Sequence, residues 1–467
     1  MADTPAPSAT DATRLPGGDV PPVPRHRLPH RGQPRPLRRL NRALRVLGPG
    51  LITGAADDDP SGITTYSQTG AAFGTGQLWL ALYMVPLMIA VQEMCGRIGL
   101  VTGQGIAGVV RKHYRREILY GAVALVLVAN TINAGTDLGA MAIAARLLLP
   151  GVPFTPLVIG FAIGVLLLEI FVPYRYYAPI LKWLTLALLA YVVTGFVVAS
   201  DWRAALRDTL VPHIELTPGF LLLVVAVLGT TISPYLFFWQ ASEEVEESIL
   251  HHRHVSPEHG AHRLGAALRL QLRRLRADTA LGMVISAIPT WFIIYTTAST
   301  LHAHGISNIT SASEAARALA PLVRSFPGAG HLAEALFALG IIGTGLLAVP
   351  ILAGSAAYGV AESFAWREGL YRPLRRARGF YAVIALATLI GVALDFLGIN
   401  PIQALIYTAV LNGIATVPLL VLILLVANNR TIMGAHTNGW LGNVVGVITT
   451  LAMGAAAVAL VVSLWWH

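Results

Sequence analysis

Residues 54–62 read Gly-Ala-Ala-Asp-Asp-Asp-Pro-Ser-Gly, in the middle of an otherwise apolar segment over residues 45–72. A carboxylate costs about 3 kcal/mol or more at the centre of a bilayer, so three in a row are not expected to face lipid. Pro60 removes a backbone donor and clashes with the preceding turn, and Gly62 tolerates unusual dihedral angles. The stretch therefore predicts an unwound segment with free carbonyls beside carboxylates. A membrane tolerates such a segment only where it lines a cavity or binds an ion.

The composition indicates a polytopic membrane protein. Of the 467 residues, 55% are hydrophobic and 12% are charged, whereas soluble domains carry roughly a quarter charged residues. This excludes an ordinary soluble enzyme, and the high hydrophobicity excludes a largely disordered chain. The single cysteine, Cys95, excludes an intrachain disulfide and a cysteine-based metal or redox site.

Eleven apolar stretches are long enough to span a bilayer, which takes about 20 residues. They lie at 45–72, 77–96, 118–148, 157–172, 180–199, 219–239, 279–299, 333–357, 380–397, 402–427 and 440–466. With the N-terminus inside, 28 of the 33 basic residues fall on inside segments and 5 on outside segments. This split predicts a cytoplasmic N-terminus and an external C-terminus in a cell membrane. Only two of the 33 basic residues are lysines and the rest are arginines, a ratio that is typical of a GC-rich, bacterial genome.

A second interruption lies in the sixth stretch, where residues 229–235 read Gly-Thr-Thr-Ile-Ser-Pro-Tyr. Interrupted segments at the first positions of two five-helix halves indicate an inverted-repeat secondary transporter with its site near the midplane. Two unrelated proline kinks are the alternative, which the carboxylate cluster disfavours. The expected parts are a disordered cytoplasmic tail at 1–44, repeats at 45–200 and 219–427, a cytoplasmic loop at 243–278 within the second repeat, and an extra helix at 438–467.

The two breaks offer carboxylate, carbonyl and hydroxyl oxygens, and neither contains Cys, Met or His. Oxygen-only sites suit hard cations such as Mg²⁺, Ca²⁺ or Mn²⁺. The sequence therefore predicts a cation transporter with Asp59 as the principal ligand.

Several motifs resemble the Nramp family of divalent-metal transporters. They are Gly48-Pro49-Gly50, Asp59-Pro60-Ser61-Gly62, Gln68-Thr69-Gly70-Ala71, the stretch from Gln92-Glu93 to Thr102-Gly103, and the Gly229-to-Pro234 break. The resemblance covers nearly the whole chain after residue 45. It implies an all-α membrane protein with a LeuT-type fold of five plus five inverted helices, discontinuous helices 1 and 6, and one extra helix.

Three departures from the family pattern bear on the ion and its coupling. The family has Asp-Pro-Gly-Asn in helix one, where residues 59–62 are Asp-Pro-Ser-Gly, and Met-Pro-His in helix six, where residues 233–235 are Ser-Pro-Tyr. Loss of the thioether and amide argues against selectivity for soft transition metals. The pattern looks most like the Nramp-related branch that includes magnesium transporters, whose wider site accepts a hydrated ion. In helix three, Asp137 matches the first member of the family's acidic pair but Ala140 stands at the second, which argues against tight proton coupling.

Carried over residue by residue, the resemblance implies a metal site built from two breaks. Its ligands would be the Asp59 carboxylate, the Ala56 carbonyl, the Thr230 carbonyl or hydroxyl, and Ser233 acting through water. Weaker candidates are Asp57, Asp58, Gly62, Tyr235 and Asp137. Asp57 and Asp58 lie outside the family's ligand set. They either add negative potential at a vestibule or pair with arginine or backbone donors, and the sequence leaves both interpretations open.

Two polar groups elsewhere in the stretches are candidates for the site or its pathway. Asp137 is interpreted as part of an ion or proton pathway, because Asn130, Asn133 and Thr136 indicate a hydrated helix face. Asn412, in the tenth stretch, either faces the site or hydrogen-bonds a neighbouring helix.

Other charged residues have structural explanations. Glu93 precedes Arg97 by four residues, which predicts a helical ion pair. Glu169 is equally consistent with a place on the pathway and with an ion pair to Arg175 near the cytoplasmic end, and Asp395 is placed at the outer interface. In the 243–278 loop, glutamates precede a histidine-rich segment at 251–262, which suggests either a metal-sensing loop or a solvated connector. The connector is favoured because no ligand spacing recurs, although the acidic run would attract cations near the inner exit.

The sequence thus predicts a secondary transporter that imports Mg²⁺, with Mn²⁺ as a further substrate, by alternating access without tight proton coupling. The alternatives are a proton-coupled Nramp-type importer of Mn²⁺ or Fe²⁺ and a LeuT-fold symporter of amino acids or other organic solutes. No nucleophile–base or zinc-type motif lies in an apolar stretch, so an enzyme is not expected. The metal is substrate rather than cofactor. The expected partners are the cation and the bilayer, without nucleic acid, and a monomer is the expected state.

Overall fold

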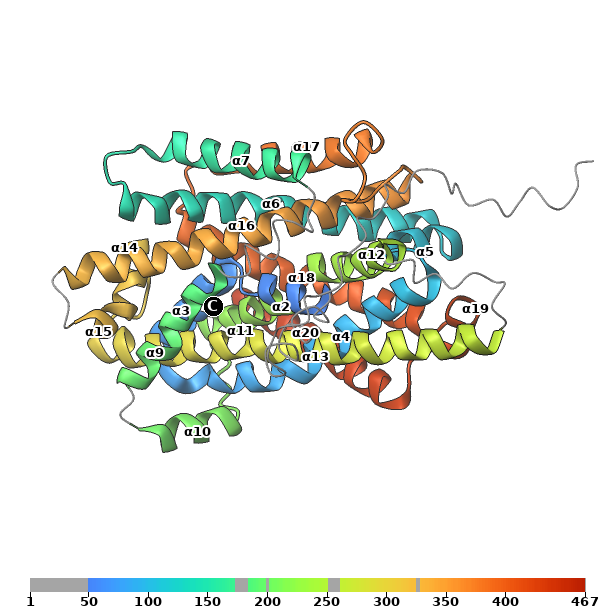
Figure 1. The fold of residues 1–467 in the computed structure, drawn as a ribbon. Coiled ribbons are helices and arrows are strands. Elements are labelled where there is room, and N and C mark those ends of the chain that lie inside the picture. The colour runs from blue at the N-terminus through green and yellow to red at the C-terminus, as the bar shows by residue number, and fades with distance from the viewer. Residues whose placement is uncertain (1–48, 173–183, 199–200, 251–260, 325–327, 467) are drawn as a thin grey trace, which may run out of the picture. The chain divides into compact units, whose positions relative to one another are not determined.

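The computed structural model describes residues 49–466 except 173–183, 199–200, 251–260 and 325–327 (Figure 1). Within these ranges every regular element is helical. The predicted tail at 1–44 lies outside the described residues. The α-helices are α2 (Pro49–Asp57), α3 (Pro60–Phe73), α4 (Leu78–Thr102), α5 (Ile106–His113), α6 (Arg116–Leu148), α7 (Phe154–Phe171), α9 (Leu189–Val198), α10 (Trp202–Leu210), α11 (Pro218–Thr231), α12 (Pro234–Leu250), α13 (Ala261–Thr300), α14 (Ala312–Ala316), α15 (Ala320–Val323), α16 (Ala329–Ser363), α17 (Arg378–Leu394), α18 (Pro401–Asn428), α19 (Arg430–Met433) and α20 (Trp440–Trp466).

Each of the eleven predicted stretches coincides with helical structure where it is described, but the exact count of eleven spans is not confirmed. Eight helical segments of the described chain are long and apolar enough to cross a membrane, and α17 and the region around α9 are shorter apolar helices. One cause of the difference is that a 3₁₀ turn, η2 (Gly74–Gln77), joins α3 directly to α4. The two helices then form one helical segment over Pro60–Thr102.

Both predicted helix breaks are present. The first separates α2 from α3 at residues 58–59, and the second separates α11 from α12 at residues 232–233. In each case a proline begins the second half, where its missing N–H costs nothing because first-turn donors have no intrahelical partner. A proline therefore ends one half-helix and starts the next at each break.

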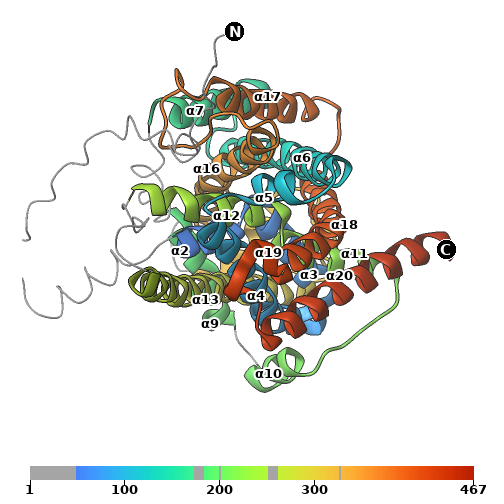
Figure 2. The same cartoon turned by 90° about the vertical axis from the view of Figure 1, so that its right-hand side faces the viewer.

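The interrupted helices lie among the longer ones (Figures 1 and 2). The α2 and α3 helices both contact α13, and α11 contacts α3 and α18, while the long helices α6 and α16 pack against each other. Glycine pairs let three sets of backbones approach closely, as small residues do between membrane helices. The pairs are Gly54–Gly282 between α2 and α13, Gly135–Gly391 between α6 and α17, and Gly229–Gly413 between α11 and α18.

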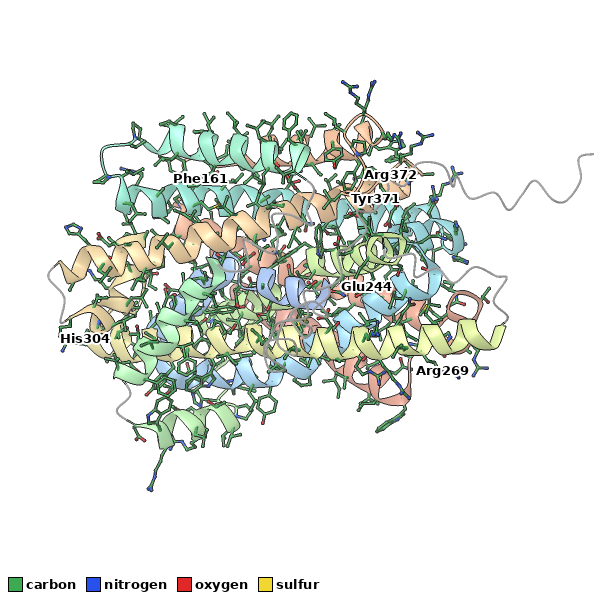
Figure 3. The ribbon with its side chains drawn as sticks, in the orientation of Figure 1. Phe161, Glu244, Arg269, His304, Tyr371 and Arg372 are labelled. Carbon is green, nitrogen blue, oxygen red and sulfur yellow. The ribbon has the colours of Figure 1, made fainter. Side chains whose placement is uncertain are left out.

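Several labelled polar side chains lie toward the ends of the helices. Figure 3 shows Arg269, Tyr371 and Arg372 toward one end and His304 at the other, with Phe161 along α7. This placement fits a chain whose middle is apolar and whose ends are polar. The eight candidate spans and the nearly all-helical chain together identify a multi-pass membrane protein.

The predicted loop at 243–278 is largely helical, which corrects the sequence-based boundaries. The α12 helix continues to Leu250, and α13 already begins at Ala261. Glu244 and Glu246 are buried, and Glu246 accepts hydrogen bonds from the Tyr358 hydroxyl and the Leu370 amide. This part of the acidic run is therefore packed against α16 and its C-terminal connection. The histidine-rich segment at 251–262 falls on residues or side chains outside the described set.

Candidate functional site

Asp59 lies where the two helix breaks meet. It has an extended backbone and is the N-cap of α3, so its side chain accepts a hydrogen bond from the first turn. Its Oδ1 accepts from the Gly62 amide at 2.7 Å and from the Ser61 hydroxyl at 2.8 Å. Because residue 59 must be extended for this cap, the α2 helix cannot continue into α3, and a carboxylate is fixed inside the protein.

Residues from α11 and α6 complete the surroundings of this carboxylate. The Thr230 hydroxyl donates to Asp59 Oδ1 at 3.2 Å and lies 3.0 Å from the Ser61 hydroxyl. The Asn133 amide on α6 donates to Asp59 Oδ2 at 3.1 Å. Asp59, Thr230 and Asn133 are all fully buried. Both predicted breaks therefore contribute to one cluster, as the ligand set anticipates for Asp59 and Thr230.

The Ala56 carbonyl and the second break also face one another. The Tyr235 hydroxyl donates to the Ala56 carbonyl oxygen at 2.8 Å, so this predicted ligand already has a donor. Ser233 is fully buried, and its hydroxyl has no hydrogen-bond partner among the described residues. Gly62 is packed so closely that a Cβ there would lie 3.3 Å from Asp59 Oδ1 and from Thr230 Oγ1. The structure thus brings the two breaks together at Ala56 and Tyr235.

Several further polar atoms near this cluster lack partners in the described part of the chain. They are both carboxylate oxygens of Asp137 and Oδ1 of Asn133. Elsewhere, on α18, both side-chain polar atoms of Asn412 also lack partners among the described residues. Asp137 lies beside the Ser61 backbone and within electrostatic range of Asp59. Buried polar groups are normally hydrogen-bonded, so such unsatisfied atoms call for water or an ion. The predicted hydrated face of α6 is consistent with this pattern.

Asp57 and Asp58 do not have the partners anticipated for them. The Ser286 hydroxyl on α13 donates to Asp57 Oδ2 at 2.7 Å, and the Thr290 hydroxyl lies 3.4 Å from Asp58 Oδ1. Both aspartates are buried, with 0% and 3% exposure, so neither lies at an open vestibule. Within the described ranges no ion pair involves either residue. In place of the arginine or backbone donors of the second interpretation, hydroxyls of α13 face these carboxylates.

Sequence reasoning left Asn133 and Ser61 out of the site, although both contact the Asp59 side chain. A signal for Asn133 was present, because Asn130, Asn133 and Asp137 are three and four residues apart and so share one face of a helix. Asn130 instead donates to the Leu352 carbonyl of α16. For Ser61 the signal was its place beside an N-cap.

The remaining predictions for charged residues have different outcomes. The Glu93–Arg97 ion pair is confirmed at 2.7 Å, and Arg276 of α13 also contacts Glu93 at 2.8 Å. Glu169 is buried, and its expected partner Arg175 lies outside the described residues. Asp395 lies at the end of α17 close to α6, where a Cβ on Gly139 would approach its Oδ1 to 2.5 Å.

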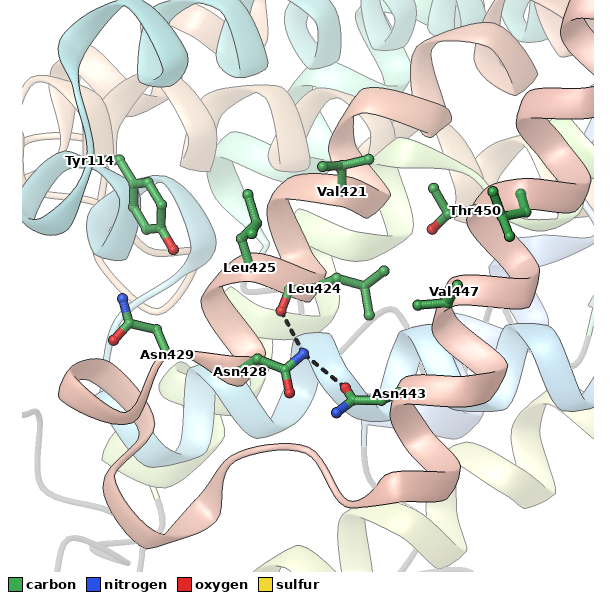
Figure 4. A pocket seen from close by; sticks show the side chains of 10 residues that line it. Tyr114, Val421, Leu424, Leu425, Asn428, Asn429, Asn443, Val447 and Thr450 are labelled. Carbon is green, nitrogen blue, oxygen red and sulfur yellow. Dashed lines mark hydrogen bonds between the residues drawn. The ribbon is translucent and has the colours of Figure 1, made fainter.

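A pocket of about 800 Å³ lies away from this cluster, between α18 and α20 beside Tyr114 (Figure 4). Its walls are mainly apolar, and Asn428 donates to Asn443 Oδ1 at 2.8 Å along its edge. It contains no acidic side chain, so it does not offer the ligands that a divalent cation requires.

The sequence matches the family described as "Natural resistance-associated macrophage protein-like" over residues 50–463, which is nearly the entire chain. The chain belongs to the Nramp family. Members of this family are transporters, so the expectation that the chain is not an enzyme is confirmed.

Similar proteins of the Nramp family are known by sequence and by structure. The chain is 25% identical over 427 residues to "Divalent metal cation transporter MntH" of Klebsiella pneumoniae (strain 342), covering 87% of this chain and 92% of the relative. It is 28% identical over 400 residues to the protein of the same name from Chromohalobacter salexigens, covering 84% and 85%.

Two solved structures show the fold. The Eremococcus coleocola manganese transporter, in complex with an aromatic bis-isothiourea substituted compound, superimposes with a TM-score of 0.67 at 17% identity, covering 92% of this chain and 88% of the other. MhsT in complex with L-phenylalanine superimposes with a TM-score of 0.55 at 14% identity, covering 89% and 98%. These matches confirm the LeuT-type transporter fold implied by the sequence.

Proposed function

We propose that this Nramp protein imports divalent metal cations across a bacterial plasma membrane, with Mn²⁺ as its main substrate. The observation that carries the proposal is the buried Asp59 carboxylate at the meeting point of two helix breaks, in contact with the hydroxyls of Ser61 and Thr230. The ligands are Asp59, the Ala56 carbonyl and Thr230, with Ser233 reaching the ion through water. Carboxylate, carbonyl and water ligands suit Mn²⁺ as well as Mg²⁺.

The choice of Mn²⁺ differs from the sequence-based preference for Mg²⁺. It is supported by the names of the similar proteins, which are a divalent metal cation transporter and a manganese transporter. Mg²⁺ is the second candidate, and one observation favours it. Ser233 and Tyr235 leave no thioether or imidazole in the second break, and Mg²⁺ keeps several waters that a buried, unpartnered hydroxyl such as that of Ser233 would bind.

The contact between Tyr235 and Ala56 defines what must change when the ion binds. A carbonyl oxygen has two lone pairs, so one donor does not exhaust it, but the positively polarised hydroxyl hydrogen on that oxygen opposes the binding of a cation there. We expect binding to move the hydroxyl away from Ala56. Because Ala56 lies in the last turn of α2 and Tyr235 in the first turn of α12, this motion couples occupancy of the site to the relative position of the two half-helices.

A second question about the transport mechanism, besides the identity of the ion, is whether metal entry is coupled to protons. The sequence-based interpretation of weak coupling rests on Ala140, which stands where the family has its second helix-three acid. The Asp395 carboxylate lies against Gly139, the residue next to Ala140, and within electrostatic range of Asp137. Asp395, which directly follows α17, therefore places a second acid next to this part of α6 and within electrostatic range of Asp137, and this observation favours the proton-coupled alternative.

The proposal is tested with purified protein in proteoliposomes loaded with a metal-sensitive dye, with a pH-sensitive dye in a parallel preparation. We expect saturable Mn²⁺ entry that is competed by external Mg²⁺ and unaffected by amino acids. A higher kcat/KM for Mg²⁺ than for Mn²⁺ would establish the second candidate instead. Acidification of the lumen that accompanies Mn²⁺ entry would establish coupling, and metal entry without acidification would establish an uncoupled importer. No metal entry above protein-free liposomes would contradict the function.

A substitution of Ser233 by methionine tests whether this position faces the ion. Thioether ligands favour softer metals, so Ser233→Met is expected to improve competition by Cd²⁺ relative to Mg²⁺ by roughly tenfold, which corresponds to about 1.4 kcal/mol. Ser233→Ala is the matched control, because it removes the same hydroxyl without adding sulfur. If both variants keep the wild-type order of competing ions, residue 233 does not contact the ion.

A further inference from the structure

Asp57 and Asp58 form a second pair of buried carboxylates beside the Asp59 cluster. Asp57 is the last residue of α2 and Asp58 is the first residue of the break. Both side chains turn to the same part of α13. Ser286 donates to Asp57 Oδ2 at 2.7 Å and also lies within hydrogen-bonding range of Asp58, and Thr290, one helical turn further along, faces Asp58. Two carboxylates and two hydroxyls therefore converge.

One oxygen of this group has no partner. Asp57 is fully buried, and within the described ranges its Oδ1 accepts no hydrogen bond. Oδ1 and Oδ2 belong to one carboxylate, and Oδ2 is bonded to Ser286, so the free oxygen lies inside the same cluster. A buried acceptor without a donor is costly. This atom indicates that something absent from the protein itself completes the group.

The electrostatics of the surroundings favour a cation there. No lysine or arginine of the described chain pairs with Asp57 or Asp58, and an uncompensated buried charge is strongly destabilising. The C-terminal end of α2 adds the negative end of a helix dipole at Asp57. The hydroxyls of Ser286 and Thr290 reduce this negative potential only partly, because they carry no charge.

The pair is separate from the site at Asp59, although the residues are consecutive. Asp59 is held by Ser61 and Gly62 of α3, Thr230 of α11 and Asn133 of α6. In contrast, Asp57 and Asp58 are held by α13. The two adjacent threonines at the end of α11 are also divided between the Asp59 site and the Asp57/Asp58 pair. Thr230 contacts Asp59, whereas Thr231 is hydrogen-bonded to Tyr66 at 2.8 Å, and Tyr66 lies within electrostatic range of Asp57 and Asp58.

We propose that Asp57 and Asp58, together with the hydroxyls of Ser286 and Thr290, bind a second divalent cation next to the transported one. Two carboxylates balance the charge of one divalent ion, and all four side chains offer the oxygen ligands that hard cations prefer. The second ion holds the end of α2 against α13, beside the break where the transported ion binds. This inference uses residues outside the ligand set of the proposed function, but it rests on that function for the identity of the ion.

Mn²⁺ is the probe for the test, which uses the purified full-length protein in detergent and equilibrium dialysis. We expect two Mn²⁺ per wild-type chain, one in the double variant Asp57→Asn/Asp58→Asn and one in Asp59→Asn. Asp201→Asn, at the exposed N-cap of α10, is the control and is expected to keep two. In wild type, electron paramagnetic resonance of the fully loaded protein is expected to show spin–spin broadening between two nearby ions. Neither single-ion variant is expected to show it.

The outcomes separate this inference from the proposed function. One Mn²⁺ per wild-type chain that is lost only in Asp59→Asn would overturn the second site and leave the transport site intact. Two Mn²⁺ in the Asp57→Asn/Asp58→Asn variant would also overturn it. Absence of Mn²⁺ binding to wild type would contradict both proposals. If the double variant does not purify as a monodisperse protein, Ser286→Ala decides the question. It keeps both carboxylates, and the proposal expects it to weaken one of the two binding events by about tenfold and leave the other unchanged.

Discussion

Replacement of Asp59 by asparagine is expected to lower Mn²⁺ uptake into proteoliposomes by roughly 10- to 100-fold. The estimate follows from the loss of an interaction with a charged group, which is worth about 1.5–3 kcal/mol, at about 1.4 kcal/mol for each factor of ten. The fold is expected to persist, because asparagine caps a helix N-terminus about as well as aspartate does. The amide oxygen can still accept from the Gly62 amide and the Ser61 hydroxyl, which hold residue 59 now.

The matched control for this experiment is Asp201→Asn. Asp201 is also an N-cap aspartate, and its carboxylate accepts from the amides of Arg203 and Ala204 at the start of α10. It is exposed and belongs to neither helix break, so uptake by Asp201→Asn is expected to equal that of wild type. Near-normal uptake by Asp59→Asn in the same preparations would remove this carboxylate from the transport site.

Replacement of Gly54 by alanine is expected to abolish transport and to reduce the yield of folded protein sharply. A Cβ at residue 54 would lie 2.4 Å from the carbonyl oxygen of Gly282, and a backbone atom cannot move aside as a flexible side chain does. Overpacking of this kind typically costs about 1–3 kcal/mol and sometimes more. Relief requires α2 to move away from α13, which displaces Ala56 and all three aspartates that follow it. The measurements are size-exclusion profile, thermal unfolding and Mn²⁺ uptake.

The control for Gly54→Ala is Gly121→Ala in α6, because a Cβ at residue 121 has no atom within 4 Å. Alanine is a better helix former than glycine by about 1 kcal/mol, so this variant is expected to be at least as stable as wild type and equally active. Equal behaviour of Gly54→Ala and Gly121→Ala would show that α2 and α13 do not pack as closely as the structure indicates.

The fold could be predicted largely from local signals. Long apolar stretches specify membrane helices, and a proline beside carboxylates or hydroxyls specifies a break, as at Pro60 and Pro234. The exact span count could not be obtained this way, because Gly74–Gln77 forms a 3₁₀ turn that continues the helical path between α3 and α4. The extension of α12 to Leu250 was not predicted, because the run of glutamates at 243–247 is typical of a solvent-exposed loop. Glu246 is buried there by contacts with Tyr358 and Leu370, which are more than a hundred positions away.

In the candidate site, too, some residues could be predicted from the sequence and others depend on distant contacts. Asp59 was predicted from its place in a break beside Pro60, and Thr230 from the resemblance to the Nramp family, and the structure brings them together. The partners of Asp57 and Asp58 were not predicted, because Ser286 and Thr290 are more than 200 residues away and lie on a helix with no unusual composition. Similarly, a contact such as that of Tyr235 with Ala56 depends on how the half-helices are placed in space. The local sequence identifies the polar groups of the site, and tertiary packing determines which residues they contact.

Anomalous X-ray diffraction from crystals soaked in Mn²⁺, recorded near the manganese absorption edge, is the most direct test of the central claim that a divalent cation binds where the two helix breaks meet. We predict an anomalous peak at about 2.2 Å from an Asp59 carboxylate oxygen, between the distances typical of oxygen ligands of Mg²⁺ and of Ca²⁺, and close to the Ala56 carbonyl and Thr230. The peak is expected to disappear in crystals of Asp59→Asn. Crystals with no peak beside Asp59, or with the same peak in Asp59→Asn, would contradict the account.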